Sequence, residues 1–355
     1  MVAENDLLNW LKNYDKTDLT IATLCSHTSL QIFNGARKEG FRTLGISVGK
    51  PPKFYDAFPN GKPHEFFEIK EHIDILEKTE ELRAKNTIII PHGSFVEYLG
   101  PANFEKLHVP TFGNRNVLRW ESSREKEREW LEGAGIKMPR LFHNPEDIDR
   151  PAVVKFDGAK GGRGFFIVKN YQEFKQVSPK DTYNIQEYVL GCRYYLHYFY
   201  SPIKEEGYKL SKGSLELLSI DRRDETNIDE MYKLGSQEEL KKLDIYPSFV
   251  VVGNVPLTIR ESLLSDVFDM GEKVVEKSFE LFGGIIGPFC LETIVDDKLE
   301  FKVFEVSARI VAGTNPFTSG SPYSEFLAPD LSTGRRIAQE IKLANETGRL
   351  GEVLS

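Results

Sequence analysis

A lysine inside an apolar run and the glycine-rich turn after it form the clearest chemical signal in the chain. Lys155 stands in AVVKF, the turn runs from Gly158 to Gly164, and a second apolar run, GFFIV, follows. The turn therefore joins two predicted strands and opens no helix, which excludes the Walker A and dinucleotide-binding loops. Backbone N–H groups beside glycines can approach phosphate oxygens, and Lys155 and Lys160 add positive charge. A plain hairpin turn is the alternative, but an unpaired lysine buried in a strand is costly.

Two glutamates on a later predicted hairpin are the second signal. If the loop between IGPFCLETIV and LEFKVFEV holds an even number of residues, Glu292 and Glu305 project from one face of neighbouring strands. Buried like charges repel one another unless a cation joins them, and oxygen-only ligands suit Mg²⁺ or Mn²⁺. The alternative is a salt bridge from these glutamates to Arg309 or Lys155. The same face is expected to carry Cys290, Ile294, Phe301, Val303, Ser307 and Arg309.

Polar residues also follow three other predicted strands. His27 and Ser29 come after LTIATL, and Ser94 comes after NTIII. In an open α/β sheet the ligand binds at the carboxyl ends of the strands, where hydroxyls and free N–H groups favour an anion such as a monophosphate. Glu187 ends the strand NIQEYVL, where it could accept hydrogen bonds from an amine or a ribose hydroxyl. The alternatives are a structural imidazole for His27, a helix N-cap for Ser29 and a solvated acid for Glu187.

Two different patterns of secondary structure must position these residues. From Asp18 to about Pro110, short β-branched runs such as RTLGISV alternate with the predicted helices SLQIFNGARKEG and EIKEHIDILEKTEEL. This alternation is typical of a parallel βαβ sheet. After Pro151 the predicted strands follow one another directly, which indicates antiparallel pairs. The sequence therefore predicts an α/β unit followed by an α+β unit.

Three helices are expected outside the first unit. Ser122 with Glu125 forms a capping box that opens a connecting helix through Trp130. An apolar stripe with a 3.6-residue period predicts a long helix over 261–282, and a closing helix is expected over 335–346. The long helix must cover a core with its apolar stripe.

The composition narrows the class of protein. The 355 residues include 46 Lys and Arg against 54 Asp and Glu, a net charge of −8, with acids and bases intermixed. A general nucleic-acid binder is disfavoured, because phosphate-backbone affinity needs clustered cations. No run approaches the roughly 18 apolar residues of a membrane span, and the first residues do not resemble a signal peptide. Cys25, Cys192 and Cys290 lie too far apart for a disulfide frame or a zinc cluster. We expect a cytoplasmic protein without membrane or nucleic-acid partners.

The order of these features resembles the ATP-grasp superfamily. The segments TIATLCSHTSL, PHGSF, FGNRNVLRWES, GNVPLTIRESLL and GPFCLET are also similar to archaeal formate-dependent ligases. Those ligases make 5-formamidoimidazole-4-carboxamide ribonucleotide (FAICAR) from the corresponding aminoimidazole (AICAR), and the resemblance runs from about Thr20 to Arg336. It implies an N-terminal Rossmann-like (pre-ATP-grasp) parallel-sheet domain over 1–121. A two-part α+β ATP-grasp domain would follow, with the glycine-rich loop in 122–201 and the metal site in 202–355.

The resemblance implies an enzyme of purine synthesis whose substrates are ATP, formate and AICAR. Formate would attack the γ-phosphate of ATP to give formyl phosphate, and the amine of AICAR would take the formyl group. The metal would be Mg²⁺ or Mn²⁺, and family members assemble as homo-oligomers. The implied site residues are Lys155, Lys160 and Arg309 for catalysis; His27, Ser94 and Asn254 for AICAR; Lys155, Gly158, Lys160, Gly161, Gly162, Gly164, Glu187, Tyr188, Val189 and Glu225 for ATP; and Glu292 and Glu305 for the metal.

Two departures from the superfamily pattern keep other functions open. ATP-grasp enzymes usually place Asn two residues after the second metal glutamate, and Ser307 stands there. The stretch 310–312 is also more apolar than expected beside the metal. One alternative is a diverged ligase that joins a different carboxylate to an amine. Another is a non-catalytic nucleotide-binding protein.

Overall fold

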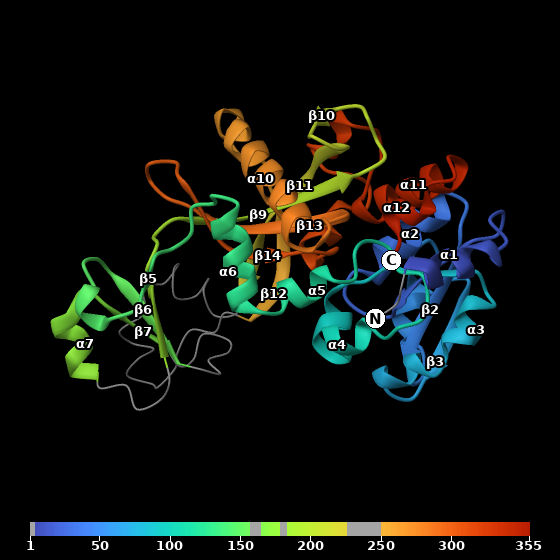
Figure 1. Cartoon of the computed structure of the whole chain (residues 1–355), viewed down its shortest axis with the longest axis horizontal. Coiled ribbons are helices and arrows are strands. Elements are labelled where there is room, and N and C mark those ends of the chain that lie inside the picture. Colours follow the sequence, from blue (N-terminus) through green and yellow to red (C-terminus); the bar gives the residue numbers. More distant parts are fainter. Residues whose placement is uncertain (1–3, 157–164, 178–182, 226–249) are drawn as a thin grey trace.

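The structure, a computed structural model, describes residues 4–156, 165–177, 183–225 and 250–355. Its strands form three sheets, which succeed one another along the long axis of the molecule (Figure 1). A small antiparallel sheet lies at one end, a six-stranded antiparallel sheet lies in the middle, and a parallel sheet lies at the other end. The predicted fold class, a parallel α/β unit followed by a two-part α+β unit, is confirmed.

The parallel sheet has the strand order β3-β2-β1-β4. β1 (Thr20–Leu24) pairs with β2 (Arg42–Val48) on one side and with β4 (Thr87–Ile89) on the other. All residues of β1 and β4 are buried, as expected for β-branched strands covered on both faces. The carboxyl ends of β1 and β4 therefore lie side by side, and they bring together the two polar segments that follow these strands.

The fourth strand, β3 (Glu65–Ile69), corrects a sequence prediction. The stretch 68–82 was expected to be one helix, but its first residues pair with β2 as an edge strand. Half-exposed edge strands carry polar residues, so EFFEI lacks the buried pattern that marks β1. The helical elements of this part are α1 (Glu4–Lys12), α2 (Ser29–Lys38), η1 (Lys53–Ala57), η2 (His72–Leu76), α3 (Thr79–Arg83), η3 (Phe95–Leu99), α4 (Pro101–Phe104) and α5 (Val117–Glu121).

The small sheet carries the lysine strand. Its order is β5-β8-β6-β7, with every neighbouring pair antiparallel. Lys155 pairs with Phe165 on one side and with Asn184 on the other, so the predicted hairpin of two antiparallel strands is confirmed. The elements are β5 (Leu141–Phe142), η4 (Pro145–Asp147), β6 (Ala152–Phe156), β7 (Phe165–Val168), α7 (Tyr171–Val177) and β8 (Tyr183–Glu187).

The six-stranded sheet has the order β10-β11-β9-β13-β14, and β12 pairs with β11. One face packs on α10 (Leu264–Phe282), the long amphipathic helix predicted from the apolar stripe. The contact is close, because a Cβ at Gly271 of α10 would lie 2.8 Å from the Tyr198 ring. The opposite face is left for polar residues. The strands are β9 (Cys192–Ser201), β10 (Tyr208–Lys209), β11 (Ser214–Glu225), β12 (Val251–Pro256), β13 (Gly287–Val295) and β14 (Phe301–Ser307).

The connecting helix α6 (Arg124–Gly133) begins one residue later than predicted. Ser123 is its N-cap, accepting a hydrogen bond from the Lys126 amide, whereas Ser122 ends α5. The Trp130 indole of α6 donates to the Val274 carbonyl of α10 at 2.9 Å. The connector is thus anchored in the core of the central sheet. The remaining helical elements are η5 (Glu261–Leu263), η6 (Ala312–Phe317), η7 (Ser324–Phe326), α11 (Thr333–Glu346) and α12 (Leu350–Val353).

Helix α11 attaches the end of the chain to the parallel-sheet part by crossing α2. A Cβ at Gly35 of α2 would lie 2.2 Å from the Arg335 backbone nitrogen, and one at Gly334 would lie 2.3 Å from the Gln31 carbonyl oxygen. Only glycine permits this approach of two backbones. The crossing fixes α2, and with it the polar segment at the start of α2, relative to the central sheet.

Replacing Gly35 by alanine is expected to lower the free energy of unfolding by about 2–3 kcal/mol, because the helices must separate. Urea unfolding followed by circular dichroism measures the change. Gly351→Ala in α12 is the control: its Cβ would meet nothing nearer than the Leu8 side chain at 3.5 Å, so no loss is expected. Equal stability of the two variants would contradict the close crossing.

The sheet topology bears on the expected boundary at 201 between the two ATP-grasp parts. β9 pairs with β11 and β13 in the central sheet, so we propose that the boundary between the two ATP-grasp parts lies before Cys192.

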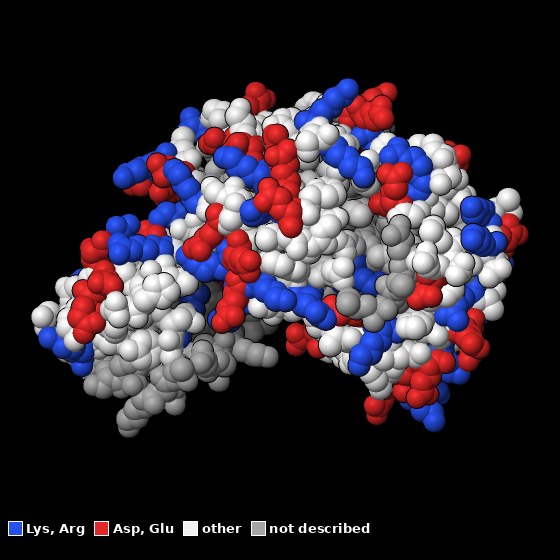
Figure 2. Space-filling view, in the orientation of Figure 1, with Lys and Arg blue, Asp and Glu red and all other residues white. Residues whose placement is uncertain are grey.

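Within the described residues, no helix is long and apolar enough to cross a membrane. On the face shown in Figure 2, acidic and basic side chains are intermixed.

Candidate active site

The polar face of the central sheet collects side chains from all of its long strands. On this face β9 and β11 run antiparallel, with Asp221 opposite Tyr195, and β13 follows β9 with Glu292 opposite Tyr195. Side chains two residues apart share a face, so the polar and charged groups of four strands and β12 converge. They are Arg193, Tyr195 and His197 from β9; Asp221, Arg223 and Glu225 from β11; Asn254 from β12; Cys290 and Glu292 from β13; and Glu305 and Ser307 from β14.

Glu292 and Glu305 lie directly opposite each other on β13 and β14, as predicted. Between this pair and the loop, the pairing of the two strands differs from the prediction. The register shifts after this pair, so that Thr293 faces Val303 and Val295 faces Phe301. This bulge turns Val303 and Phe301 into the core beneath α10, and their predicted position on the glutamate face is wrong.

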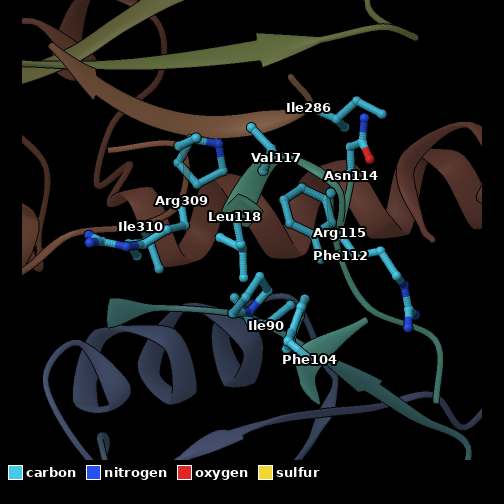
Figure 3. A pocket seen from close by; sticks show the side chains of 14 residues that line it. Ile90, Phe104, Phe112, Asn114, Arg115, Val117, Leu118, Ile286, Arg309 and Ile310 are labelled. Atoms are coloured by element: carbon cyan, nitrogen blue, oxygen red, sulfur yellow. The ribbon is translucent and has the colours of Figure 1, made fainter. Parts of the chain in front are cut away.

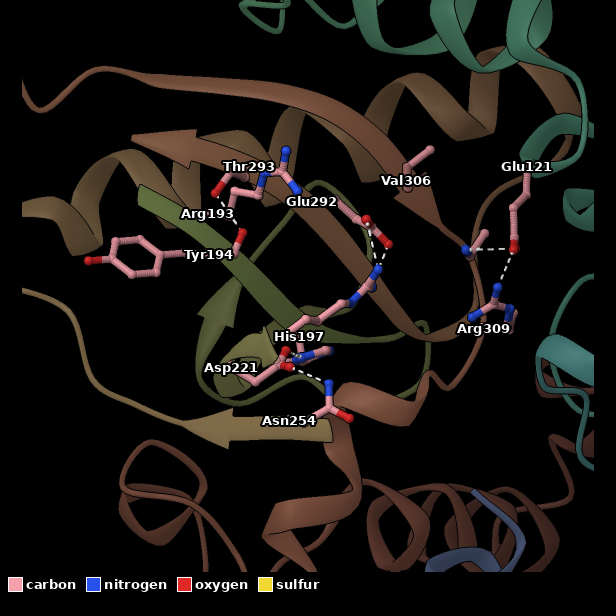
Figure 4. Close-up of polar contacts among 12 residues, drawn as sticks. Glu121, Arg193, Tyr194, His197, Asp221, Asn254, Glu292, Thr293, Val306 and Arg309 are labelled. Atoms are coloured by element: carbon pink, nitrogen blue, oxygen red, sulfur yellow. Dashed lines mark hydrogen bonds and ion pairs between the residues drawn. The ribbon is translucent and has the colours of Figure 1, made fainter. Parts of the chain in front are cut away.

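Arg223 neutralises the first of these glutamates. Its guanidinium makes a two-pronged ion pair with Glu292, with N–O distances of 2.6 and 3.2 Å, and lies 3.8 Å from the centre of the Tyr195 ring. Dashed lines mark the contacts of Glu292 in Figure 4. Glu292 and the other nearby groups raise the pKa of Arg223, although its burial acts the other way. Arg309 and Lys155, which the alternative interpretation named as ion-pair partners, do not pair with Glu292.

Glu305 keeps its carboxylate open. Among the described residues it has no hydrogen-bond or ion-pair partner, and its side chain reaches solvent. The surrounding chain and then the Glu292 carboxylate raise its pKa to about 7. A cation would relieve this repulsion.

Two further carboxylates hold the end of β14 in place. Glu127 of α6 accepts a hydrogen bond from the Val306 amide at 2.5 Å, and Glu121 at the end of α5 accepts one from the Ala308 amide at 2.9 Å. Burial raises the pKa of both carboxyls, for Glu127 to about 8. Neither was predicted, because acids in the charged segment 121–132 look solvated in the sequence. They fix the backbone on both sides of Ser307.

Arg309 lies between the carboxylates and the parallel sheet. One of its terminal nitrogens pairs with Glu121 at 2.8 Å (Figure 4), and a Cβ at Gly93 would lie 3.7 Å from its guanidinium carbon. Its buried Nε has no partner among the described residues. Arg309 therefore keeps one N–H free at the junction of two sheets.

The carboxyl ends of β1 and β4 form the expected polar cluster. The rings of His27 and His92 lie edge to face at 5.9 Å, and the hydroxyls of Ser94 and Thr28 are buried without a partner in the described structure. His27 is exposed and has a backbone φ of 43°, which is uncommon outside glycine. Unpaired buried hydroxyls beside an imidazole are suited to bind an anion's oxygens. The alternative role of Ser29 as an N-cap is wrong, because Thr28 occupies that position and the Ser29 hydroxyl bonds the Tyr55 hydroxyl.

His92 is a structural neutral imidazole. Its Nδ1 accepts from the Ser94 amide at 3.2 Å, so its Nε2 must carry the proton and donate to the Leu24 carbonyl at 3.0 Å. Complete burial lowers the pKa of His92 to about 3. This ring holds the two strand exits together and adds no charge.

The small sheet supplies Lys155 and Glu187. Lys155 donates to the Gln186 side chain at 3.3 Å, and burial, followed by Arg124 and Arg193, lowers its pKa, while Glu305 acts in the opposite sense. Glu187 is already engaged: its carboxylate accepts from Lys302 of β14 at 2.6 Å and from the Arg140 amide at 3.1 Å. Its carboxylate thus bridges the small and central sheets.

Of the other residues expected to bind ATP, some lie in the described part of the chain and some lie outside it. Tyr188 and Val189 follow β8 directly, and the Tyr188 amide donates to the Pro151 carbonyl at 2.8 Å. Glu225 ends β11 and pairs with Arg193 at 2.9 Å. The remaining expected residues lie outside the described part of the chain: Gly158, Lys160, Gly161, Gly162 and Gly164.

A buried group that the sequence did not reveal lies beside Asn254. Asp221 is 2.5 Å from His197 through one carboxylate oxygen and accepts from the Asn254 amide at 2.7 Å through the other. The three residues come from three strands, and the register between β9 and β11 shifts between Leu217 and Ser219. No fixed spacing marks such a group in a sequence.

A small cavity lies at the seam of the parallel and central sheets (Figure 3). Its lining is mainly apolar and includes Ile90, Phe112, Leu118, Ile286 and Ile310, with a volume of about 20 Å³. Such a volume holds no more than about one water molecule. The cavity is therefore a packing seam and is too small for a nucleotide.

The residues present fit a divalent cation held together with a phosphate. Glu292 and Glu305 offer two carboxylates at one register position, and Glu305 is not neutralised by any described residue. Within the described ranges, no three His, Cys, Asp or Glu side chains can hold a metal by themselves. Mg²⁺ typically takes one or two carboxylates and completes its shell with water and phosphate oxygens.

Comparisons with known proteins identify relatives along the whole chain. Family models described as "Protein of unknown function (DUF1246)" and "Domain of unknown function (DUF1297)" match residues 21–142 and 169–355. The 5-formaminoimidazole-4-carboxamide-1-(beta)-D-ribofuranosyl 5'-monophosphate synthetase of Methanococcoides burtonii is 62% identical, and the match covers 100% of both chains.

Solved structures agree. The IMP biosynthesis protein PurP from Thermococcus kodakaraensis is 32% identical with a TM-score of 0.73, and the match covers 94% of this chain and 100% of that one. N5-Carboxyaminoimidazole synthetase from Staphylococcus aureus, complexed with ADP, is 15% identical with a TM-score of 0.60 over 91% of this chain and 77% of that one. The second likeness shows the fold alone.

Proposed function

The chain belongs to the 5-formaminoimidazole-4-carboxamide ribonucleotide synthetase family, and from this membership we propose that it is an ATP-dependent ligase that formylates AICAR to FAICAR with formate. The arrangement of two neighbouring groups of polar side chains supports the proposal. Arg309 lies between Glu305, a carboxylate with no partner in the described structure, and the polar cluster with the unpaired hydroxyls of Ser94 and Thr28. A site for a metal-bound triphosphate thus lies beside a site for a nucleotide monophosphate.

We assign the monophosphate of AICAR to the exits of β1 and β4. Ser94 and Thr28 hold buried hydroxyls without partners in the described structure, and His27 lies exposed beside them. Arg309 provides positive charge nearby, and burial, followed by this charge, lowers the pKa of His27. A phosphate would satisfy these donors, whose burial without a partner is otherwise unfavourable.

We assign ATP to the region between the small and central sheets. Lys155 and Arg193 supply positive charge there, and Glu187 fixes the two sheets through Lys302. Glu292 and Glu305 would hold Mg²⁺ or Mn²⁺, which when bound would offset the charge of the transferring phosphoryl group. The glycine-rich turn and Lys160 are assigned to the same phosphates on the sequence alone.

The reaction requires two transfers in one site. A formate oxygen attacks the γ-phosphorus of ATP and ADP leaves; the amine of AICAR then attacks the formyl carbon and phosphate leaves. The free Nε–H of Arg309 lies between the two nucleotide positions, where it can hold an oxygen of formate or of the acyl phosphate. Water must be excluded, because it would hydrolyse formyl phosphate.

The proposal is tested by incubating the protein with ATP, Mg²⁺, ¹³C-formate and AICAR and analysing the nucleotides by mass spectrometry. The expected product carries one labelled formyl group per ADP released, and omission of any substrate stops both. ATP turnover that ignores AICAR, or product from another acid, would favour the diverged ligase. Nucleotide binding without product from any acid would indicate a non-catalytic protein.

Metal binding is expected to depend on pH through Glu305. Its raised pKa of about 7 means that a proton occupies the carboxylate below that pH and competes with the metal. The apparent affinity for Mn²⁺ should therefore fall by up to about tenfold per pH unit below 7 and level off above it. Fluorescence titration with Mn²⁺ measures the profile. Glu305→Gln should bind weakly at every pH, and a break near the ordinary glutamate pKa would contradict the assignment.

We also propose that the chain assembles as a homo-oligomer, as expected from the resemblance. Sedimentation or light scattering of the purified protein at several concentrations tests this. A monomer at every concentration would overturn it.

A further inference from the structure

Asp221 is the centre of a fully buried polar group on the active-site face. It is 0% exposed, and both of its carboxylate oxygens are used. One oxygen lies 2.5 Å from the His197 Nε2, and the other accepts from the Asn254 Nδ2 at 2.7 Å. Since a carboxylate only accepts, both neighbouring nitrogens must point an N–H at Asp221.

Close packing fixes the side chains of Asp221 and His197 in one position. Gly313 of η6 covers it so closely that a Cβ there would lie 2.5 Å from the Asp221 oxygen and 2.8 Å from the His197 ring. η6 is in turn held to the parallel-sheet part, because Gln31 of α2 donates to the side chains of Thr314 and Asn315. Asp221 therefore takes its position from both halves of the site.

The consequence is a fixed orientation of the half-buried Asn254 amide. Its nitrogen is committed to Asp221, and Figure 4 shows its oxygen turned away from Asp221. The reverse orientation would place the amide oxygen against the carboxylate, where two acceptors repel each other. On the side turned away from Asp221, Asn254 thus presents its amide oxygen, a hydrogen-bond acceptor.

We propose that Asp221, held by His197, is a positioning residue that makes Asn254 an acceptor for the amine N–H of the nucleotide substrate. The inference rests on the proposed function and deepens it, because an oriented acceptor selects a ligand with a donor at that position. Holding one N–H of the amine also directs its lone pair to one side, from which it attacks the formyl carbon. His197 supports the group through its Nε2–H; its Nδ1 has no partner in the described structure.

The test compares binding of AICAR with binding of the same ribonucleotide carrying hydrogen in place of the amine. Calorimetric titrations without ATP give the ratio of the two dissociation constants. The unsubstituted protein is expected to prefer the amine by about tenfold, the value of one good hydrogen bond to a buried acceptor. In Asn254→Ala the preference should vanish, and in Asp221→Asn it should fall by at least about threefold, because the Asn254 amide is then free to turn.

A purely structural role would weaken both nucleotides equally and leave their ratio unchanged, which would overturn the proposal. The same holds if Asn254→Ala retains the preference, since the acceptor would then serve another group. Asp224→Asn is the matched control: this neighbouring residue of β11 is exposed and should keep the ratio. The KM for ATP should stay the same in all variants. Failure of the unsubstituted protein to bind either nucleotide would instead count against the proposed function.

Discussion

Replacement of Glu305 by glutamine is expected to lower the rate of FAICAR formation by about a thousandfold or more, the largest effect at any single position. Glutamine has the same shape but cannot supply the negative charge that a divalent cation needs. In this chain the loss is severe because Glu292 already shares its charge with Arg223, through contacts of 2.6 and 3.2 Å. Glu305 is the carboxylate of the pair that no described residue neutralises, and we propose that it holds the metal.

The same substitution should not destabilise the fold. The Glu305 carboxylate is repelled by Glu292 and has no described partner, so its removal relieves an unfavourable interaction. Turnover, Mn²⁺ affinity and thermal unfolding should be measured together. Glu300→Gln, at an exposed position of the same hairpin paired with Lys137, is the control and should leave all three unchanged. Full activity of Glu305→Gln with unaltered metal affinity would remove the metal from this hairpin.

The prediction from sequence succeeded where spacing determines geometry. Glu292 and Glu305 are close along one hairpin, and the prediction that they lie opposite each other is confirmed. The expected even-numbered loop is wrong, however: the loop is 296–300, an odd number of residues, and the bulge supplies the shift that brings the two glutamates into register. Lys155 is likewise fixed by its own hairpin. Continuous runs rich in β-branched residues predicted β1 and β4, and an apolar stripe with a 3.6-residue period predicted α10.

Prediction failed where position depends on distant contacts. The bulge after Glu292 moves Val303 into the core, and no residue type in the sequence predicts a bulge at this position. Asp221 and His197 meet only because β9 and β11 adopt one register, and each alone looks like an ordinary polar residue of a strand. Edge strand β3 was missed for another reason. Because it is partly exposed, its sequence shows no regular alternation of apolar and polar residues.

Replacing Arg309 by lysine is expected to lower kcat by about a hundredfold, the second-largest effect, while Mn²⁺ affinity is retained. Arg309 uses one terminal nitrogen on Glu121 at 2.8 Å and keeps a buried Nε–H without a partner in the described structure. Only the planar fork of a guanidinium can serve both directions at once. A lysine ammonium that remains on Glu121 cannot also reach the oxygen of the acyl group.

Separate measurements distinguish this role from simple support of the fold. Arg335→Lys is the matched control, because that guanidinium is also paired with a glutamate, Glu39 at 2.7 Å, but lies outside the site. It should lose stability to a similar extent as Arg309→Lys and yet keep its kcat. With Arg309→Lys, ADP release should also exceed FAICAR formation, because an acyl phosphate that is held loosely is hydrolysed before the amine attacks. Tight coupling of the two products in this variant would show that Arg309 acts on neither formate nor the acyl phosphate.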